Sequence, residues 1–171
     1  MKNFTHNEIE SLIACRKIII DPPRKEMKIE RGTIRNDMRL KAENSDLEFY
    51  VFMRINEKFP ENFSIGLVVR PKDEPGDICL LRCNGPHGEF TDNPLEPIEL
   101  HPHFCTHIHK AREQNMRDGL LPERHAEKTE SYASYEEALS FFVKETNIIN
   151  AERHLSIHPQ LGLFNNSENQ Q

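Results

Sequence analysis

Hydrophobic residues recur at two different spacings along the chain, which predicts a fold that combines helices and strands. Apolar side chains from Ile9 to Ile13 follow the spacing of a helix, directly after a capping box of Thr5 and Glu8. This pattern predicts a helix over about residues 7–20.

The apolar spacing falls to two in the middle of the chain, as it does in half-buried strands. Turn-forming residues separate the extended segments at even intervals, which is typical of an antiparallel meander. We expect five strands, around residues 34–40, 47–55, 64–70, 78–83 and 100–110.

A second capping box, Ser134 and Glu137, opens an apolar stripe that predicts a helix over residues 134–147. The charged residues 113–131 predict irregular or weakly helical structure. Together these elements predict an α+β fold, in which an antiparallel sheet of about five strands carries the N-terminal and C-terminal helices on one face.

The composition favours a single small domain. The chain has 171 residues, so we expect one domain over 1–164 and a disordered tail over 165–171. No apolar run could span a membrane and the N-terminus lacks the apolar stretch of a signal peptide, which predicts a cytosolic protein without membrane contact. The net charge of −6 argues against indiscriminate nucleic-acid binding, although residues 16–41 form a local basic segment.

The segment 101–109 concentrates the candidate chemistry, because four of its residues are histidine. In a strand, alternate side chains share a face, and all four histidines lie at odd-numbered positions. They are His101, His103, His107 and His109. Two imidazoles placed in this way can ligate one metal ion, or can flank a phosphate as acid and base.

Three interpretations of these histidines stay open. They can form a polar structural surface. They can hold a metal ion, with His107 and His109 as two of the ligands. The third ligand would then be His103 or His87. They can also cleave a phosphodiester without a metal or another cofactor, with His107 and His109 as the acid–base pair and Arg82 stabilising the developing charge.

A long loop over residues 84–99 follows the fourth predicted strand. Connections of this length are uncommon in compact domains and are frequently functional. If strand 78–83 pairs with the histidine strand, Arg82, Asn84 and His87 would lie beside the histidines and complete the site. An ordinary turn is the alternative interpretation.

Basic side chains form a second candidate surface. Four of them lie at odd-numbered positions in and next to the first predicted strand, opposite its apolar residues, and would share one face of an extended chain: Arg31, Arg35, Arg39 and Lys41. Such a face can contact the phosphates of RNA, and Lys110 and Arg112, which follow the histidines, are further candidates. A solvated strand face is the alternative.

The order of these motifs resembles that of a family of small bacterial proteins, and is similar in outline to TumE-type toxins of toxin–antitoxin pairs. The resemblance covers about residues 33–148. Its motifs are Leu81-Arg82-x-Asn84-Gly85-Pro86-His87, then His103-Phe-x-x-His107-Ile-His109, then the helix that begins at Ser134. This chain departs from the outline by carrying Asn84 where Asp is more usual.

The resemblance implies a cytosolic protein that binds or cleaves RNA and is held by an antitoxin partner. The alternative is a non-catalytic inhibitor or adaptor, with structural histidines and a protein partner such as a host factor. A metal-dependent hydrolase is the third hypothesis.

Overall fold

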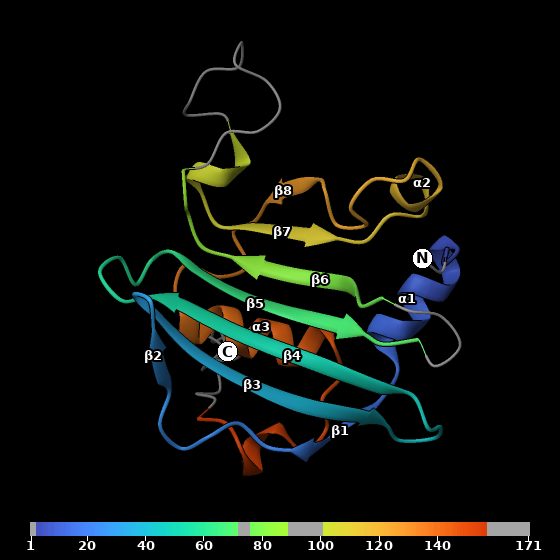
Figure 1. Ribbon diagram of the computed structural model, residues 1–171, viewed down its shortest axis with the longest axis horizontal. Coiled ribbons are helices and arrows are strands. Elements are labelled where there is room, and N and C mark those ends of the chain that lie inside the picture. The colour runs from blue at the N-terminus through green and yellow to red at the C-terminus, as the bar shows by residue number, and fades with distance from the viewer. Residues whose placement is uncertain (1–2, 72–75, 89–100, 157–171) are drawn as a thin grey trace, which may run out of the picture.

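The computed structural model describes residues 3–71, 76–88 and 101–156, and its strands form one antiparallel sheet (Figure 1). The strand order is β1-β3-β4-β5-β6-β7-β8, and β2 pairs with β3. The strands are β1 (Lys17–Asp21), β2 (Lys28–Glu30), β3 (Thr33–Ala42), β4 (Glu48–Asn56), β5 (Phe63–Val69), β6 (Ile78–Asn84), β7 (His107–Lys110) and β8 (Ala126–Lys128).

Helical elements lie beside this sheet. They are α1 (His6–Ala14), α2 (Glu113–Arg117), α3 (Tyr135–Glu145) and two 3₁₀ turns, η2 (Pro102–Phe104) and η3 (Ala151–Arg153). No helix in the described part of the chain is long and apolar enough to cross a membrane.

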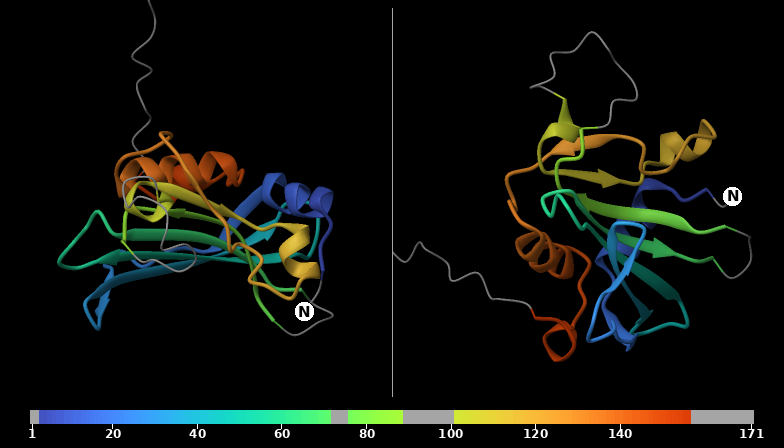
Figure 2. Two further views of the ribbon diagram at one scale, coloured as in Figure 1. Left: turned by 90° about the horizontal axis from the view of Figure 1, so that it is seen from above. Right: turned by 60° about the vertical axis from the view of Figure 1, so that its left-hand side comes forward.

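Helices α1 and α3 lie on the same side of the sheet, as the view from above shows (Figure 2). Their apolar side chains join a buried core with the strand residues that face them, among them Leu40, Val51, Ile65 and Leu67. Because directly paired residues of antiparallel strands point to the same face, the alternate residues form a second face. Neither α1 nor α3 covers that second face, which we call the open face.

The prediction of an α+β fold with an antiparallel sheet is confirmed, but the sheet has eight strands rather than five. The additional strands β1, β2 and β8 are short. Both β8 and α2 fall within residues 113–131, where the sequence predicted irregular or weakly helical structure. The predicted tail over 165–171 and most of the loop over 84–99 lie outside the described residues.

The predicted N-terminal helix extends too far. Helix α1 ends at Ala14, and Lys17–Asp21 forms β1, which pairs with β3. The reason lies in three consecutive isoleucines, 18–20, whose branched side chains favour an extended backbone over a helix.

The predicted strand over residues 100–110 is wrong in its first half. Within the described part of this segment, Pro102–Phe104 forms η2, and only His107–Lys110 forms β7. Pro102 has no backbone N–H to donate to a neighbouring strand and suits the first position of a helical turn. The His101 imidazole caps that turn by accepting a hydrogen bond from the backbone N–H of His103.

A buried lysine joins the two long helices to the sheet. Lys17 begins β1 and is completely buried. Its ammonium group donates to the carbonyl oxygens of Ile13 (2.7 Å), Cys15 (2.9 Å) and Thr146 (3.0 Å), which end α1 and α3. Helix ends leave carbonyls without intrahelical partners, so this one cation caps both helices at once. Burial lowers the pKa of Lys17.

Replacing this lysine by methionine should therefore destabilise the fold. Lys17→Met introduces an apolar side chain of similar length but leaves three carbonyls, two of them buried, without their donor, which should cost about 2–4 kcal/mol of unfolding free energy. Urea unfolding followed by circular dichroism measures the loss. Lys144→Met, at an exposed position of α3, is the control and should change the free energy by less than about 0.5 kcal/mol. Equal effects of the two substitutions would contradict this role.

Candidate metal centre

The pairing of β6 with β7 places the central residues of the site. Asn84 lies opposite His107, and Arg82 lies opposite His109. Paired residues share a face, so all four side chains belong to the open face, while Ile108 between the histidines packs against the core. The sequence predicted this orientation for His107 and His109.

His87 reaches the same position because the chain turns sharply after β6. A side chain at Gly85 would place its Cβ 1.8 Å from the carbonyl oxygen of Glu61, so this close approach requires glycine. The backbone N–H of His87 then donates to the carbonyl oxygen of His103 (2.9 Å). This hydrogen bond joins the turn after β6 to η2.

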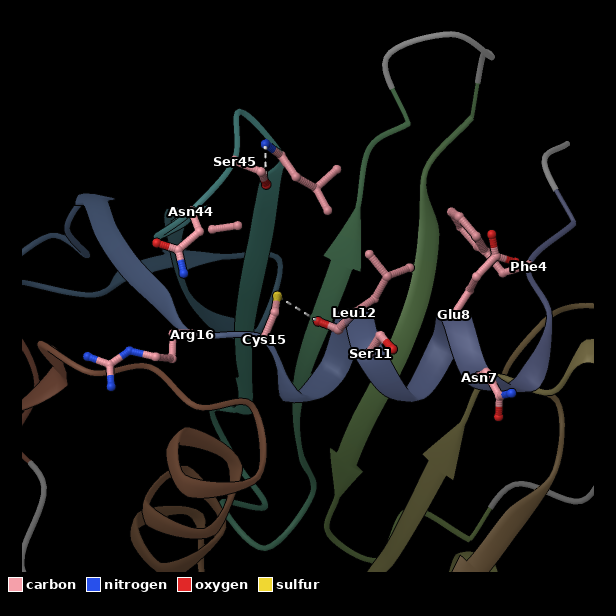
Figure 3. A pocket seen from close by; sticks show the side chains of 11 residues that line it. Phe4, Asn7, Glu8, Ser11, Leu12, Cys15, Arg16, Asn44 and Ser45 are labelled. Carbon is pink, nitrogen blue, oxygen red and sulfur yellow. Dashed lines mark hydrogen bonds between the residues drawn. The ribbon is translucent and has the colours of Figure 1, made fainter.

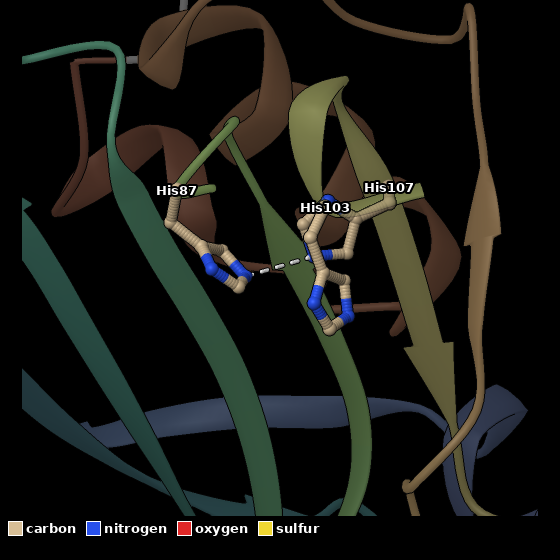
Figure 4. Close-up of side chains that lie close together, drawn as sticks. All are labelled: His87, His103 and His107. Carbon is tan, nitrogen blue, oxygen red and sulfur yellow. Dashed lines mark hydrogen bonds between the residues drawn. The ribbon is translucent and has the colours of Figure 1, made fainter. Parts of the chain in front are cut away.

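Three imidazoles converge where these segments meet (Figure 4). One ring nitrogen each of His87, His103 and His107 lies within 4.8 Å of the other two. The Nε2 atoms of His87 and His107 are 3.2 Å apart, and the ring centroids of His103 and His107 are 4.8 Å apart. We call these three residues the histidine centre.

Backbone carbonyls fix the tautomers of the two β7 histidines. His107 Nδ1 donates to the carbonyl oxygen of Cys105 (2.8 Å), and His109 Nδ1 donates to that of Glu123 (2.9 Å). In neutral imidazoles the proton is therefore on Nδ1, and each Nε2 presents a lone pair. A backbone carbonyl behind the ring is the usual support of a metal-ligating histidine.

Burial keeps both of these imidazoles neutral. His107 is 0% and His109 is 2% exposed. Burial lowers the pKa of His107 to about 4, and burial together with the Arg82 cation lowers the pKa of His109 to about 3. At neutral pH neither ring is an imidazolium that could act as a general acid, and the unprotonated Nε2 atom of each can act as a ligand.

The Nε2 atom of His107 has one lone pair but two nitrogen atoms within hydrogen-bond distance. Asn84 Nδ2 and His87 Nε2 each lie 3.2 Å from it. Zinc–nitrogen bonds of about 2.0–2.1 Å would place two tetrahedral ligands roughly 3.3 Å apart. The spacing of the two imidazoles therefore suits a shared metal ion.

Residues behind the site hold Asn84 and His107 in place. The Asn84 side-chain oxygen accepts a hydrogen bond from Ser64 Oγ (2.8 Å). The buried Tyr132 hydroxyl donates to the carbonyl oxygen of His107 (2.6 Å) and accepts from the backbone N–H of Asn84 (3.2 Å). Burial raises the pKa of Tyr132, so the hydroxyl stays protonated. Sequence reasoning missed Ser64 and Tyr132, because neither belongs to a motif.

The predicted RNA-binding residues are spread over the molecule rather than gathered at the histidines. Arg31 lies outside the strands, between β2 and β3. The other five form ion pairs: Arg35–Glu30, Arg39–Glu48, Lys41–Asp46, Lys110–Glu10 and Arg112–Glu127. Lys110 pairs with Leu81 across β6 and β7, on the face that the helices cover.

A separate pocket of about 420 Å³ lies between α1 and the turn that joins β3 to β4 (Figure 3). Leu12 and Leu47 give it apolar walls, and polar side chains such as Asn44 and Ser45 line its edge. No histidine lines this pocket among the described residues, so its chemistry differs from that of the histidine centre.

The metal-free protein should lose stability as the pH falls from 7 to 5. An unfolded histidine titrates near pH 6.5, but folded His107 and His109 resist protonation until about pH 4 and 3. The unfolded state therefore binds more protons in this window, and the loss begins below about pH 6.5. Each histidine should contribute on the order of 2 kcal/mol by pH 5, measured by urea unfolding.

Two variants separate this effect from general acid sensitivity. Asparagine can retain the donor to the Glu123 carbonyl, so His109→Asn should remove about half of the pH-dependent loss. His6→Asn, at an exposed position, should leave the loss unchanged. A His109→Asn protein with the full wild-type pH dependence would contradict the burial of a neutral imidazole.

Comparisons of the chain with protein-family models, with curated proteins and with solved structures found no match. The functional inference therefore depends on the geometry and chemistry of the residues themselves.

Proposed function

We propose that His87, His103 and His107 hold a divalent transition-metal ion of the zinc class, at a site that hydrolyses a phosphate ester. The convergence of three imidazole nitrogens within 4.8 Å carries this proposal. Neutral imidazoles are common zinc ligands, and three protein ligands leave a fourth position for water or substrate.

The surroundings of the histidine centre support an ion rather than a purely structural cluster. The Nδ1 proton of His107 is held by a backbone carbonyl, which directs the Nε2 lone pair toward His87. All three ligands are uncharged when they bind a metal, so the ion would keep its double positive charge. Arg82 lies nearby and adds a cation, which favours an anionic substrate.

A zinc ion at this position would supply a Lewis acid that lowers the pKa of bound water to about 7. Arg82 can stabilise negative charge that develops on a phosphate. Asn84 Nδ2 now donates to His107 Nε2. If a metal ion bound to that lone pair, the Asn84 amide would be free to donate a hydrogen bond to another acceptor, such as an oxygen of the substrate.

Metal-free phosphodiester cleavage by His107 and His109 is the competing mechanism. It needs one protonated and one unprotonated imidazole at the working pH. Burial lowers the pKa values of both residues far below 7, so this pair lacks the proton donor. This observation favours the metal mechanism. RNA as the substrate, a cytosolic location and an antitoxin partner stay hypotheses that are compatible with it.

Purified protein should bind about one zinc ion per chain. Elemental analysis after dialysis against zinc and then metal-free buffer measures the ratio. His107→Ala should reduce the ratio to below about 0.1, because a site with two remaining ligands loses most of its affinity. His154→Ala, at an exposed position outside the histidine centre, should keep a ratio near that of wild type.

Hydrolysis of a simple phosphodiester provides the activity readout. EDTA should abolish it and added zinc should restore it. Cleavage that survives EDTA would support the metal-free mechanism instead. A protein that binds no zinc and cleaves no phosphodiester would favour the non-catalytic interaction protein with structural histidines.

A further inference from the structure

A row of side chains crosses the open face beside the histidine centre. In the register of β4 to β7, Phe52 pairs with Gly66, Gly66 with Arg82, and Arg82 with His109. Figure 1 shows these four strands side by side in the middle of the sheet. An aromatic ring, a glycine without a side chain, a guanidinium and an imidazole therefore follow one another across the sheet.

Gly66 shapes this row by lacking a side chain. A Cβ there would lie 2.2 Å from the Phe52 ring, so the ring occupies the space above the glycine backbone. The Arg54 guanidinium lies 5.6 Å from the centre of the same ring and forms an ion pair with Asp37. These contacts hold a partly exposed aromatic ring on the surface of the sheet, where a flat ligand group could stack.

Arg82 and His109 carry complementary polar atoms that lack partners. Arg82 Nε is a buried donor and His109 Nε2 is a buried acceptor, and neither has a hydrogen bond within the described structure. Arg82 forms no ion pair with any carboxylate of the described ranges either. A buried polar atom without a hydrogen bond lowers the stability of the fold. A donor and an acceptor of this kind at paired positions of β6 and β7 therefore indicate a ligand that forms hydrogen bonds with both.

We propose that this row binds single-stranded RNA. A base stacks on Phe52, a phosphate oxygen accepts from Arg82, and the ribose 2′-hydroxyl donates to His109 Nε2. DNA lacks that hydroxyl and would leave the imidazole without a donor, so the site prefers RNA. As the substrate of the proposed metal-dependent hydrolysis, RNA rests on the proposed function. Binding of RNA to the row does not require a metal ion and can be tested separately.

Nucleotide binding also requires a local rearrangement. Both unpartnered atoms are shielded from water. The His103 ring, whose centroid is 5.5 Å from that of His109, borders this position. A rotation of the His103 side chain away from His109 would give the RNA access to the His109 Nε2 atom, and this movement requires no metal ion.

The test measures binding of fluorescein-labelled ten-residue oligouridine to metal-free protein by anisotropy, beside oligodeoxyuridine of the same length. Wild-type protein should bind the RNA at least about fivefold more tightly. Phe52→Ala should weaken binding of both oligomers about tenfold, as is usual when a stacked base loses its platform. Phe59→Ala, at an exposed aromatic outside the row, is the matched control and should have little effect.

Two further variants address the row without removing the stacking ring. Gly66→Ala should displace the ring and weaken binding of both oligomers. His109→Asn should reduce the preference for RNA to near one while still binding one zinc ion per chain. Circular dichroism verifies that each variant is folded.

The inference is overturned if wild-type protein binds neither oligomer, binds both equally, or loses no affinity in folded Phe52→Ala. It is also overturned if His109→Asn loses zinc, because His109 would then be a metal ligand. RNA preference in a protein that binds no zinc would overturn the proposed function alone. Zinc binding without RNA binding would overturn this inference alone.

Discussion

The register between β6 and β7 determines which side chains can meet at the site. It sets Asn84 against His107 and Arg82 against His109, and it sends Ile108 into the core. A slip of one residue would exchange the two faces, so that the imidazoles would point toward the helices and the isoleucine would lie on the open face. The Tyr132 hydroxyl resists such a slip, because it bonds to the backbone of both strands.

The fold maintains the histidines in a state that is costly without a ligand. Burial keeps the β7 imidazoles neutral, and their Nδ1–H groups donate to backbone carbonyls. The Nε2 lone pairs of both rings therefore lie on the open face without a proton. The apolar side of the sheet, covered by α1 and α3 and joined by Lys17, supplies the stability that offsets this cost.

Much of this arrangement follows from the sequence, and the remainder depends on contacts between distant segments. Alternation predicted the shared face of His107 and His109, and the pairing of strand 78–83 with the histidine strand was the condition under which His87 was expected beside them. The prediction that His101 and His103 belong to the same strand was wrong, because Pro102 begins a 3₁₀ turn instead of a strand. Strand β1 was missed because its three isoleucines also fit the apolar spacing of the predicted helix, and its pairing with the edge of β3 is a contact between distant segments. The contribution of Tyr132 depends on tertiary packing that no local motif encodes.

The central claim is that one metal ion binds between His87, His103 and His107. Crystals of zinc-loaded protein measured at the zinc absorption edge test it most directly. The account predicts a single strong anomalous peak about 2.0–2.1 Å from one ring nitrogen of each of these histidines, with a fourth position open to solvent or substrate. An anomalous map with no peak at the histidine centre, or with zinc bound only elsewhere, would contradict it.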